Sequence, residues 1–259
     1  MTECVIAHPD LPDVLGHTWD AESVEAIASS TGERLLVTDA SISDEVEDSV
    51  DGVVATDGTT RGGRGALTER VHDIDFRVSG SGFWQVHPAA ATTLVDAVLE
   101  GAQASPGETV LDLYAGVGLF TSFLAEAVGE TGTVLSVSPI PEDRATPGAT
   151  CMPCRRCGSS PRRSNGHCVT ALSGEAADVV VLDPPRTGAK KAVADIAALA
   201  PRRIVYVACD PAALARDLAS FAARGYQLTN LRAFALFPMT HHVECVGCPR
   251  THPAPTLTR

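Results

Sequence analysis

Cys209 stands where an α/β protein places reactive groups. It follows the apolar run Ile204–Ala208 and precedes Asp210 and Pro211. A short run that is apolar on both faces predicts a buried parallel strand, and the proline favours a helix beginning directly after it. Ligands and chemistry gather at the carboxyl ends of such strands, and a helix N-terminus beside a thiol favours the thiolate. Cys209 is therefore a candidate nucleophile, although an arbitrary cysteine is more often a small buried thiol.

A second feature with chemical potential is an acid followed by a glycine turn. Residues 109–113 predict a strand that carries Asp112, and Gly116 and Gly118 follow in a Gly-x-Gly turn. Glycines there let the backbone turn sharply and approach a ligand closely. The third glycine of the dinucleotide-binding fingerprint is replaced by Thr121, which disfavours NAD. An acid before such a turn fits S-adenosylmethionine better.

A third apolar run, Val179–Leu182, is followed directly by Asp183. The two prolines after Asp183 fix the turn. Helices are expected at about residues 91–103, from 119 onward, at 189–199 and at 211–224. Strands that alternate with helices in this way predict an α/β fold with a parallel, doubly wound sheet. A strand, a turn and the start of a closing strand are expected over residues 234–246.

The N-terminal segment, residues 1–78, alternates short apolar runs with turn residues. We expect strands at residues 35–38 and 53–56 and a short helix at 21–29. No catalytic constellation stands out, so this segment is predicted to be a β-rich accessory region.

The residues that follow, Phe83, Trp84 and Gln85, lead into the first predicted helix. The two aromatic residues are expected to be core or wall residues. Gln85 could be a polar group held at a pocket.

Composition limits the class of protein. Hydrophobic content of 44% and a charged content of 20% fit a globular chain that can bury a core. The net charge of -12 shows no excess of basic residues of the kind that binds nucleic acid. The sequence contains neither a stretch of transmembrane length nor a basic-then-apolar signal at its start. We therefore expect a cytoplasmic protein with no membrane partner, whose cysteines are thiols, metal ligands or catalysts rather than disulfides.

Five motifs between residues 83 and 246 together resemble the RNA uracil-5-methyltransferases, which include the tRNA T-loop enzyme and bacterial ribosomal-RNA enzymes. They are Phe-Trp-Gln-Val-His-Pro, Asp-Leu-Tyr-Ala-Gly-Val-Gly, Asp-Pro-Pro-Arg-Thr-Gly, Val-Ala-Cys-Asp-Pro and Phe-Pro-Met-Thr-His-His-Val-Glu. The resemblance implies a Rossmann-like, S-adenosylmethionine-dependent methyltransferase domain at residues 79–248. Residues 1–78 would be part of the family's central, accessory region.

The resemblance also implies roles for single residues. Cys209 matches the nucleophile and Glu244 the general base. Gln85, Tyr114 and Asp183 match contacts to S-adenosylmethionine or to the reacting centre. Gly116 and Gly118 match the turn beneath the cofactor. The expected partner is a tRNA or rRNA substrate, with no obligate protein partner.

The chemistry explains why these residue types are needed. Uracil C5 is a poor nucleophile, but a thiolate that adds to C6 makes an enolate whose C5 can attack a sulfonium methyl group. A base must then remove the C5 proton so that the thiol can leave. No metal is required for these steps. The target base must leave its stack to be reached.

Residues 139–168 depart from the family pattern. They contain four cysteines and His167 within a segment crowded with proline, arginine and glycine. Three interpretations stay open: a metal site formed by Cys151, Cys154, Cys157 and Cys168, a solvated natural insertion, or an out-of-frame translation bounded by two compensating shifts.

Ser138 is a second departure, because it occupies the position where the family usually places a glutamate that holds the cofactor ribose. The chain end is a third. Prolines after Val246 predict a short last strand and a disordered tail at residues 249–259. These departures leave an alternative to an active enzyme: a catalytically impaired remnant of the family that acts as an RNA-binding or structural protein.

Overall fold

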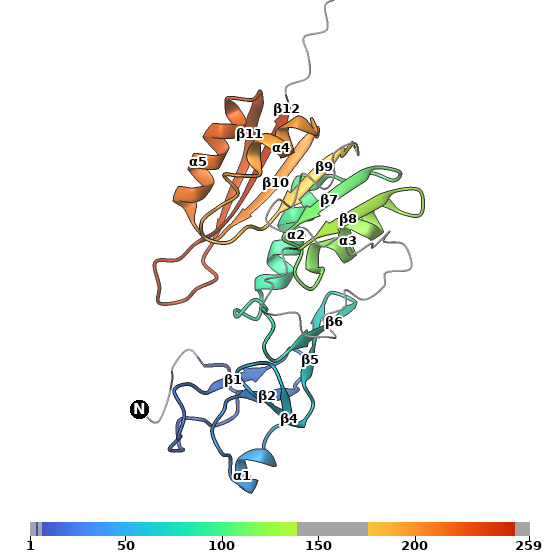
Figure 1. Ribbon diagram of the computed structural model, residues 1–259. Helices are drawn as coiled ribbons and strands as arrows, with labels where there is room; N and C mark the ends of the chain where they lie inside the picture. The colour runs from blue at the N-terminus through green and yellow to red at the C-terminus, as the bar shows by residue number, and fades with distance from the viewer. Residues whose placement is uncertain (1–3, 5–6, 139–175, 252–259) are drawn as a thin grey trace, which may run out of the picture. The chain divides into compact units, whose positions relative to one another are not determined.

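The computed structural model of the protein describes residues 4, 7–138 and 176–251 (Figure 1). The chain divides into two compact units, Met1–Pro88 and Ala89–Arg259. No helix in these described ranges is long and apolar enough to cross a membrane.

The N-terminal unit is built from a four-stranded sheet and a two-stranded sheet. Its elements are β1 (Glu25–Ala28), β2 (Arg34–Val37), α1 (Asp44–Glu47), β3 (Gly52–Val54), β4 (Thr60–Gly63), β5 (Ala66–Val71) and β6 (Ile74–Ser79). The strands predicted near residues 35–38 and 53–56 are present as β2 and β3.

The helix predicted at residues 21–29 is wrong. Part of this segment forms β1, which pairs antiparallel with β2 so that Ala26 lies opposite Leu36. The alanine-rich stretch favours a helix by local propensity, but pairing with a buried strand decides its structure.

The prediction for Phe83 is also wrong, because this side chain is 76% exposed. Trp84 does act as a wall residue. It is half-buried, and its ring centroid lies 5.7 Å from that of Phe76.

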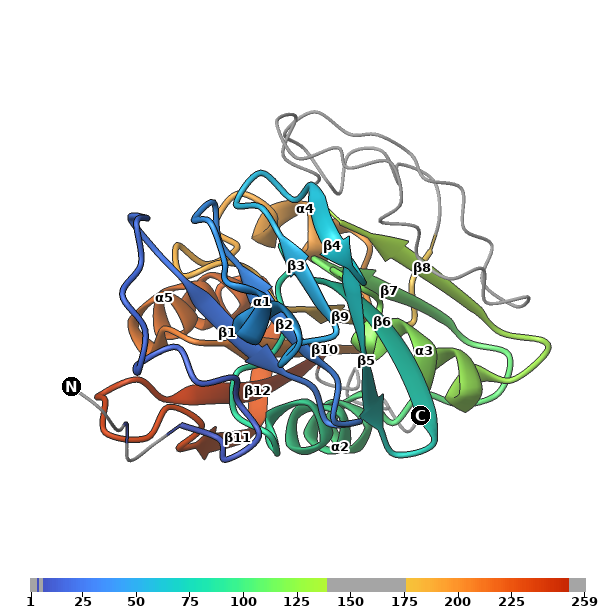
Figure 2. The same ribbon diagram turned by 90° about the horizontal axis from the view of Figure 1, so that it is seen from below.

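The C-terminal unit contains a six-stranded sheet with the order β11-β12-β10-β9-β7-β8. The strands are β7 (Thr109–Leu113), β8 (Thr133–Val137), β9 (Val179–Leu182), β10 (Arg203–Ala208), β11 (Tyr226–Phe234) and β12 (Glu244–Thr251). The helices are α2 (Ala90–Ala102), α3 (Leu119–Val128), α4 (Val193–Ala198) and α5 (Pro211–Ala222). Figure 2 shows α2 and α3 on one side of this sheet and α4 and α5 on the other.

The predicted α/β fold with a parallel sheet is confirmed in this unit. Strands β8, β7, β9 and β10 pair in parallel, and their residues are mostly buried aliphatic side chains. Parallel pairing brings the carboxyl ends of neighbouring strands to one edge of the sheet. The segments that follow Leu113, Leu182 and Ala208 therefore begin at the same edge.

The short last strand predicted from the prolines is wrong. β12 continues through Pro249 to Thr251, between β11 and β10. Pro249 lies opposite Leu228, directly beside a register shift in the β11–β12 ladder. Such an irregularity accommodates a residue that has no N–H to donate. The tail predicted at residues 249–259 thus begins within a strand, and residues 252–259 lie outside the described residues.

Candidate active site

Cys209 and Glu244 are brought together by the pairing of β10 with β12. Ala208, the last residue of β10, lies opposite Cys245 in the antiparallel register. The next residue along one strand therefore faces the preceding residue on the other, which places Cys209 beside Glu244. Cys209 is half-buried, whereas Glu244 is 4% exposed. A thiol and a carboxyl group from distant parts of the sequence thus share one site.

The electrostatics of this pair differ from the sequence-based prediction. Partial burial raises the pKa of the Cys209 thiol, and the nearby carboxyl groups of Glu244 and Asp183 raise it further, while Arg186 acts in the opposite direction. The net effect of these groups disfavours the thiolate, whereas the sequence predicted a thiolate favoured by the helix N-terminus. The N-terminus of α5 is already capped by Asp210, whose Oδ1 accepts a hydrogen bond of 2.7 Å from the backbone N–H of Ala213.

Asp183 follows β9 at the same edge of the sheet. Its backbone N–H donates to the Leu113 carbonyl oxygen at 3.3 Å, which ties it to the end of β7. Burial, together with the carboxyl groups of Glu244 and Asp112, raises the pKa of Asp183 to about 8. Burial also raises the pKa of Glu244 to about 7. These carboxyl groups can therefore hold or release protons near neutral pH.

The turn between β7 and α3 has the conformation that its glycines predict. Three residues have positive φ: Tyr114 at 66°, Gly116 at 56° and Gly118 at 87°. The Tyr114 N–H donates to the Val137 carbonyl oxygen at 2.7 Å, which fixes the turn against the end of β8. A Cβ added at Gly116 would meet no atom within 4 Å, so open space lies above the turn. This geometry lets a ligand approach the backbone closely.

Asp112 is the acid that precedes the glycine turn in the sequence, and it was not among the residues predicted to contact the cofactor. Its side chain is 0% exposed, and its Oδ2 accepts a hydrogen bond from the Thr121 hydroxyl. Its Oδ1 is buried without a hydrogen-bond partner among the described residues. Burial raises its pKa to about 7. A buried acceptor this close to the turn fits a ligand that brings a donor or a positive charge. The sequence signal is the acid within the strand directly before the glycines.

Gln85 and Ser138 are the two remaining positions that the sequence connects with the cofactor. Gln85 is half-buried in the N-terminal unit, after β6, and its role as a cofactor contact stays a prediction. Ser138 lies directly after β8 and is exposed.

The proposed metal ligands at positions 151, 154, 157, 167 and 168 lie outside the described residues. Within the described ranges, no group of three or more His, Cys, Asp or Glu residues could hold a metal ion.

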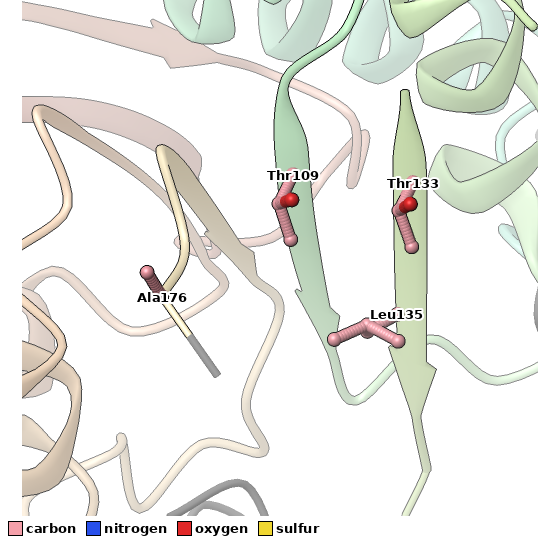
Figure 3. Close-up of a pocket in the computed structure, with 4 residues that line it drawn as sticks. All are labelled: Thr109, Thr133, Leu135 and Ala176. Carbon is pink, nitrogen blue, oxygen red and sulfur yellow. The ribbon is translucent and has the colours of Figure 1, made fainter. Parts of the chain in front are cut away.

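A pocket of about 310 Å³ lies elsewhere on the C-terminal unit (Figure 3). It is lined by Thr109, Thr133, Leu135 and Ala176. Thr109 and Thr133 are the first residues of β7 and β8, so the pocket adjoins the amino ends of these parallel strands. The chemistry-bearing residues lie at the carboxyl ends instead, and the pocket plays no part in the site.

Comparison with known proteins gives a family match in the same part of the chain. The family described as tRNA (uracil-5-)-methyltransferase matches residues 169–248, which include Asp183, Cys209 and Glu244. An uncharacterized RNA methyltransferase of Streptomyces avermitilis is 47% identical over 187 residues, covering 71% of this chain and 43% of that protein. One from Bifidobacterium longum is 39% identical over 216 residues, covering 75% of this chain and 47% of its own length.

Among solved structures, the tRNA (uracil-54, C5)-methyltransferase of Pyrococcus abyssi, in complex with S-adenosyl-L-homocysteine, matches with a TM-score of 0.67 and 23% identity. The match covers 87% of this chain and 59% of that one, and supports the fold. The chain spans less than half the length of the two curated relatives.

Proposed function

We propose that this chain, which belongs to the tRNA (uracil-5-)-methyltransferase family, transfers a methyl group from S-adenosylmethionine to C5 of a uridine in RNA. The observation that carries the proposal is the pairing of β10 with β12, which sets Cys209 beside Glu244. A nucleophile next to a separate base is what methylation of an unactivated uracil carbon requires.

The cofactor would occupy the carboxyl ends of β7 and β9. The sharp turn at Gly116 and Gly118, with open space at Gly116, leaves room for close approach to the backbone. The buried Oδ1 of Asp112 is suited to accept a hydrogen bond from the methionine ammonium group, and Asp183 stands between this position and Cys209. S-adenosylmethionine supplies an electrophilic sulfonium methyl group when bound.

In the proposed reaction, the Cys209 thiol loses its proton and the sulfur adds to uracil C6. The electron pair of the C5–C6 double bond moves to give an enolate. C5 would then bond to the methyl carbon as the bond from that carbon to the sulfonium sulfur breaks, with S-adenosylhomocysteine as the leaving group. Glu244 then takes the proton from C5, the double bond re-forms and the Cys209 sulfur leaves. At its raised pKa of about 7, Glu244 can accept this proton and return it to solvent near neutral pH.

The RNA would be a structured molecule, tRNA or rRNA, that presents an unstacked uridine. The uracil ring must lie between the sulfur and the carboxyl group, which a base within a helix cannot do. The side chain of Asp210 is occupied by capping α5, which supports Glu244 as the base.

A second candidate is a family member that binds RNA without methylating it. The observation that favours it is Ser138, which offers only a hydroxyl where the family carries a glutamate for the cofactor ribose.

Two measurements on the full-length protein separate these candidates. Calorimetry with S-adenosylmethionine tests the cofactor, and transfer of labelled methyl groups to total tRNA and rRNA, followed by mapping of the product, tests the activity. We expect both binding and 5-methyluridine. RNA binding without cofactor binding would favour the second candidate and contradict the first.

A further inference from the structure

The loop that leads into Glu244 carries a row of packed rings. Between β11 and β12, the ring centroids of Phe237 and His242 lie 6.0 Å apart in an edge-to-face arrangement. The rings of His242 and His241 follow at 4.4 Å, tilted by 37°. Phe237 and His242 are half-buried, whereas His241 is exposed at the end of the row. The row therefore begins in the protein and ends at solvent.

Thr240 holds this loop in shape. Its hydroxyl donates to the Phe237 carbonyl oxygen at 2.8 Å, and its oxygen accepts from the His242 N–H at 3.1 Å. Both bonds lie within the loop, so they fix the backbone that carries the rings. A preformed ring surface loses little conformational entropy when it binds a planar partner.

The position of the row limits what can bind there. Glu244 begins β12 directly after these residues, beside Cys209, so whatever carries the reacting base must pass the loop. Figure 1 shows the loop projecting beyond the ends of β11 and β12. At the end of β11, the Arg232 guanidinium lies 4.9 Å from the ring centroid of Phe234, which adds a cation–π pair near the base of the loop.

We propose that the rings of Phe237, His242 and His241, which we term the ring row, form a stacking platform for nucleobases that flank the target uridine. This inference rests on the proposed function. Aromatic rings offer each base a π-face regardless of its identity, and neighbouring arginines strengthen such sites. The net charge of -12 supplies little general attraction to phosphates, so stacking must contribute more of the affinity.

The test uses His241 because it is the exposed end of the row and its removal leaves the two half-buried rings in place. The probe is an RNA stem–loop with a uridine-rich loop that carries 2-aminopurine beside one uridine, because stacking quenches this fluorophore. We expect His241→Ala to raise both the Kd and the KM for this RNA about five- to a hundred-fold, with kcat and the Kd for S-adenosylmethionine unchanged. His241→Phe should restore binding because it keeps the ring. Leu231→Ala, which removes a 52% exposed apolar side chain from β11, is the matched control and should change nothing.

Two outcomes would overturn the platform. The first is a Kd for the RNA that does not change in His241→Ala. The second is a His241→Phe variant whose Kd for the RNA is as high as that of His241→Ala, which would mean that His241 acts through a hydrogen bond and not through stacking. Failure of the proposed function gives a different result. In that case RNA binds with the expected dependence on residue 241, but no methyl group is transferred at any RNA concentration.

Discussion

Cys209 and Glu244 face each other across β10 and β12 although a helix and a strand separate them in the sequence. The antiparallel pairing of Ala208 with Cys245 fixes this arrangement. Because β12 lies inside the sheet, between β11 and β10, strand pairing on both sides fixes the backbone that follows Glu244. The proposed nucleophile and the proposed base therefore come from the ends of two different strands.

The first prediction separates the roles of the two residues. Cys209→Ala should abolish both methyl transfer and any covalent RNA adduct, because no enolate forms without addition of sulfur. Glu244→Gln should still form the adduct and transfer the methyl group, but the C5 proton has no acceptor. Loss of a general base costs about 10²–10⁴-fold in rate, which lets the methylated complex accumulate. Denaturing electrophoresis with labelled RNA measures the adduct.

Asp210→Asn is the matched control for this experiment. Asparagine caps a helix as well as aspartate does, so α5 should keep its N-cap while the neighbouring carboxylate is lost. This variant should turn over normally and trap no RNA. The assignment of Glu244 as base is wrong if Asp210→Asn traps RNA while Glu244→Gln turns over.

The second prediction concerns pH. Glu244 must be deprotonated to act as base, and its pKa is about 7. Cys209 must lose its proton to attack, and its pKa is raised above the ordinary value for a thiol. Both groups bind protons in their inactive form, so kcat/KM should rise with pH through about 7 and continue to rise in the alkaline range. Initial rates of methyl transfer in buffers of constant ionic strength measure the profile, and a maximum below pH 7 would contradict it.

The third prediction follows from Asp112. Its folded-state pKa of about 7 lies above its ordinary value of 3.8, so the folded protein binds more protons than the unfolded chain between these values. The contribution of this group to stability is therefore present at low pH and lost as the pH rises from about 4 to 7. Asp112→Asn removes the buried charge and should raise the free energy of unfolding at pH 8 by up to about 4 kcal/mol.

The same substitution should weaken the binding of S-adenosylmethionine, because the ammonium group loses a negatively charged partner. Urea unfolding at pH 5 and pH 8 and calorimetry with the cofactor test both parts. The stability difference between the variant and the wild type should shrink at pH 5. If Asp112→Asn is less stable than the wild type at pH 8, burial of the Asp112 carboxylate does not destabilise the wild-type protein.

The fourth prediction concerns a buried network that holds the loop after β9. The Asp217 carboxylate, 0% exposed, accepts from the Tyr206 hydroxyl at 2.8 Å and from the Ala189 N–H at 2.7 Å. Tyr206→Phe removes a hydrogen bond to a charged group and should lower the free energy of unfolding by about 1.5–3 kcal/mol. Tyr226→Phe is the matched control, because its hydroxyl donates to the neutral Pro201 carbonyl oxygen and its loss should cost about 0.5–1.5 kcal/mol. Equal losses in urea unfolding would contradict the charge-assisted character of the first bond.

The fifth prediction concerns Ser138. If the position after β8 faces the cofactor ribose, Ser138→Glu should tighten binding of S-adenosylmethionine by about ten- to a hundred-fold, since a charge-assisted hydrogen bond contributes about 1.5–3 kcal/mol. Ser138→Gln has nearly the same size without the charge and should gain less. Calorimetry measures both variants. Weaker binding by the glutamate variant would show that this position does not approach the ribose.

The sequence alone determined the elements that depend on local pattern. The apolar runs at β7, β9 and β10 predict buried parallel strands because both faces of each strand must be covered. The glycines at 116 and 118 predict a sharp turn because few other residues adopt positive φ easily. The motifs also marked Cys209 and Glu244 as candidates for nucleophile and base.

Tertiary structure decided what depends on partners distant in the chain. Residues 25–28 form a strand because β2 pairs with them, and β12 runs through Pro249 because the ladder with β11 is irregular there. The thiol pKa of Cys209 is raised because folding buries it beside carboxyl groups from two other strands. Local sequence encodes propensity and turn geometry, whereas burial and charge proximity arise only when the sheet assembles. The proton affinities on which the proposed chemistry depends are therefore properties of the fold.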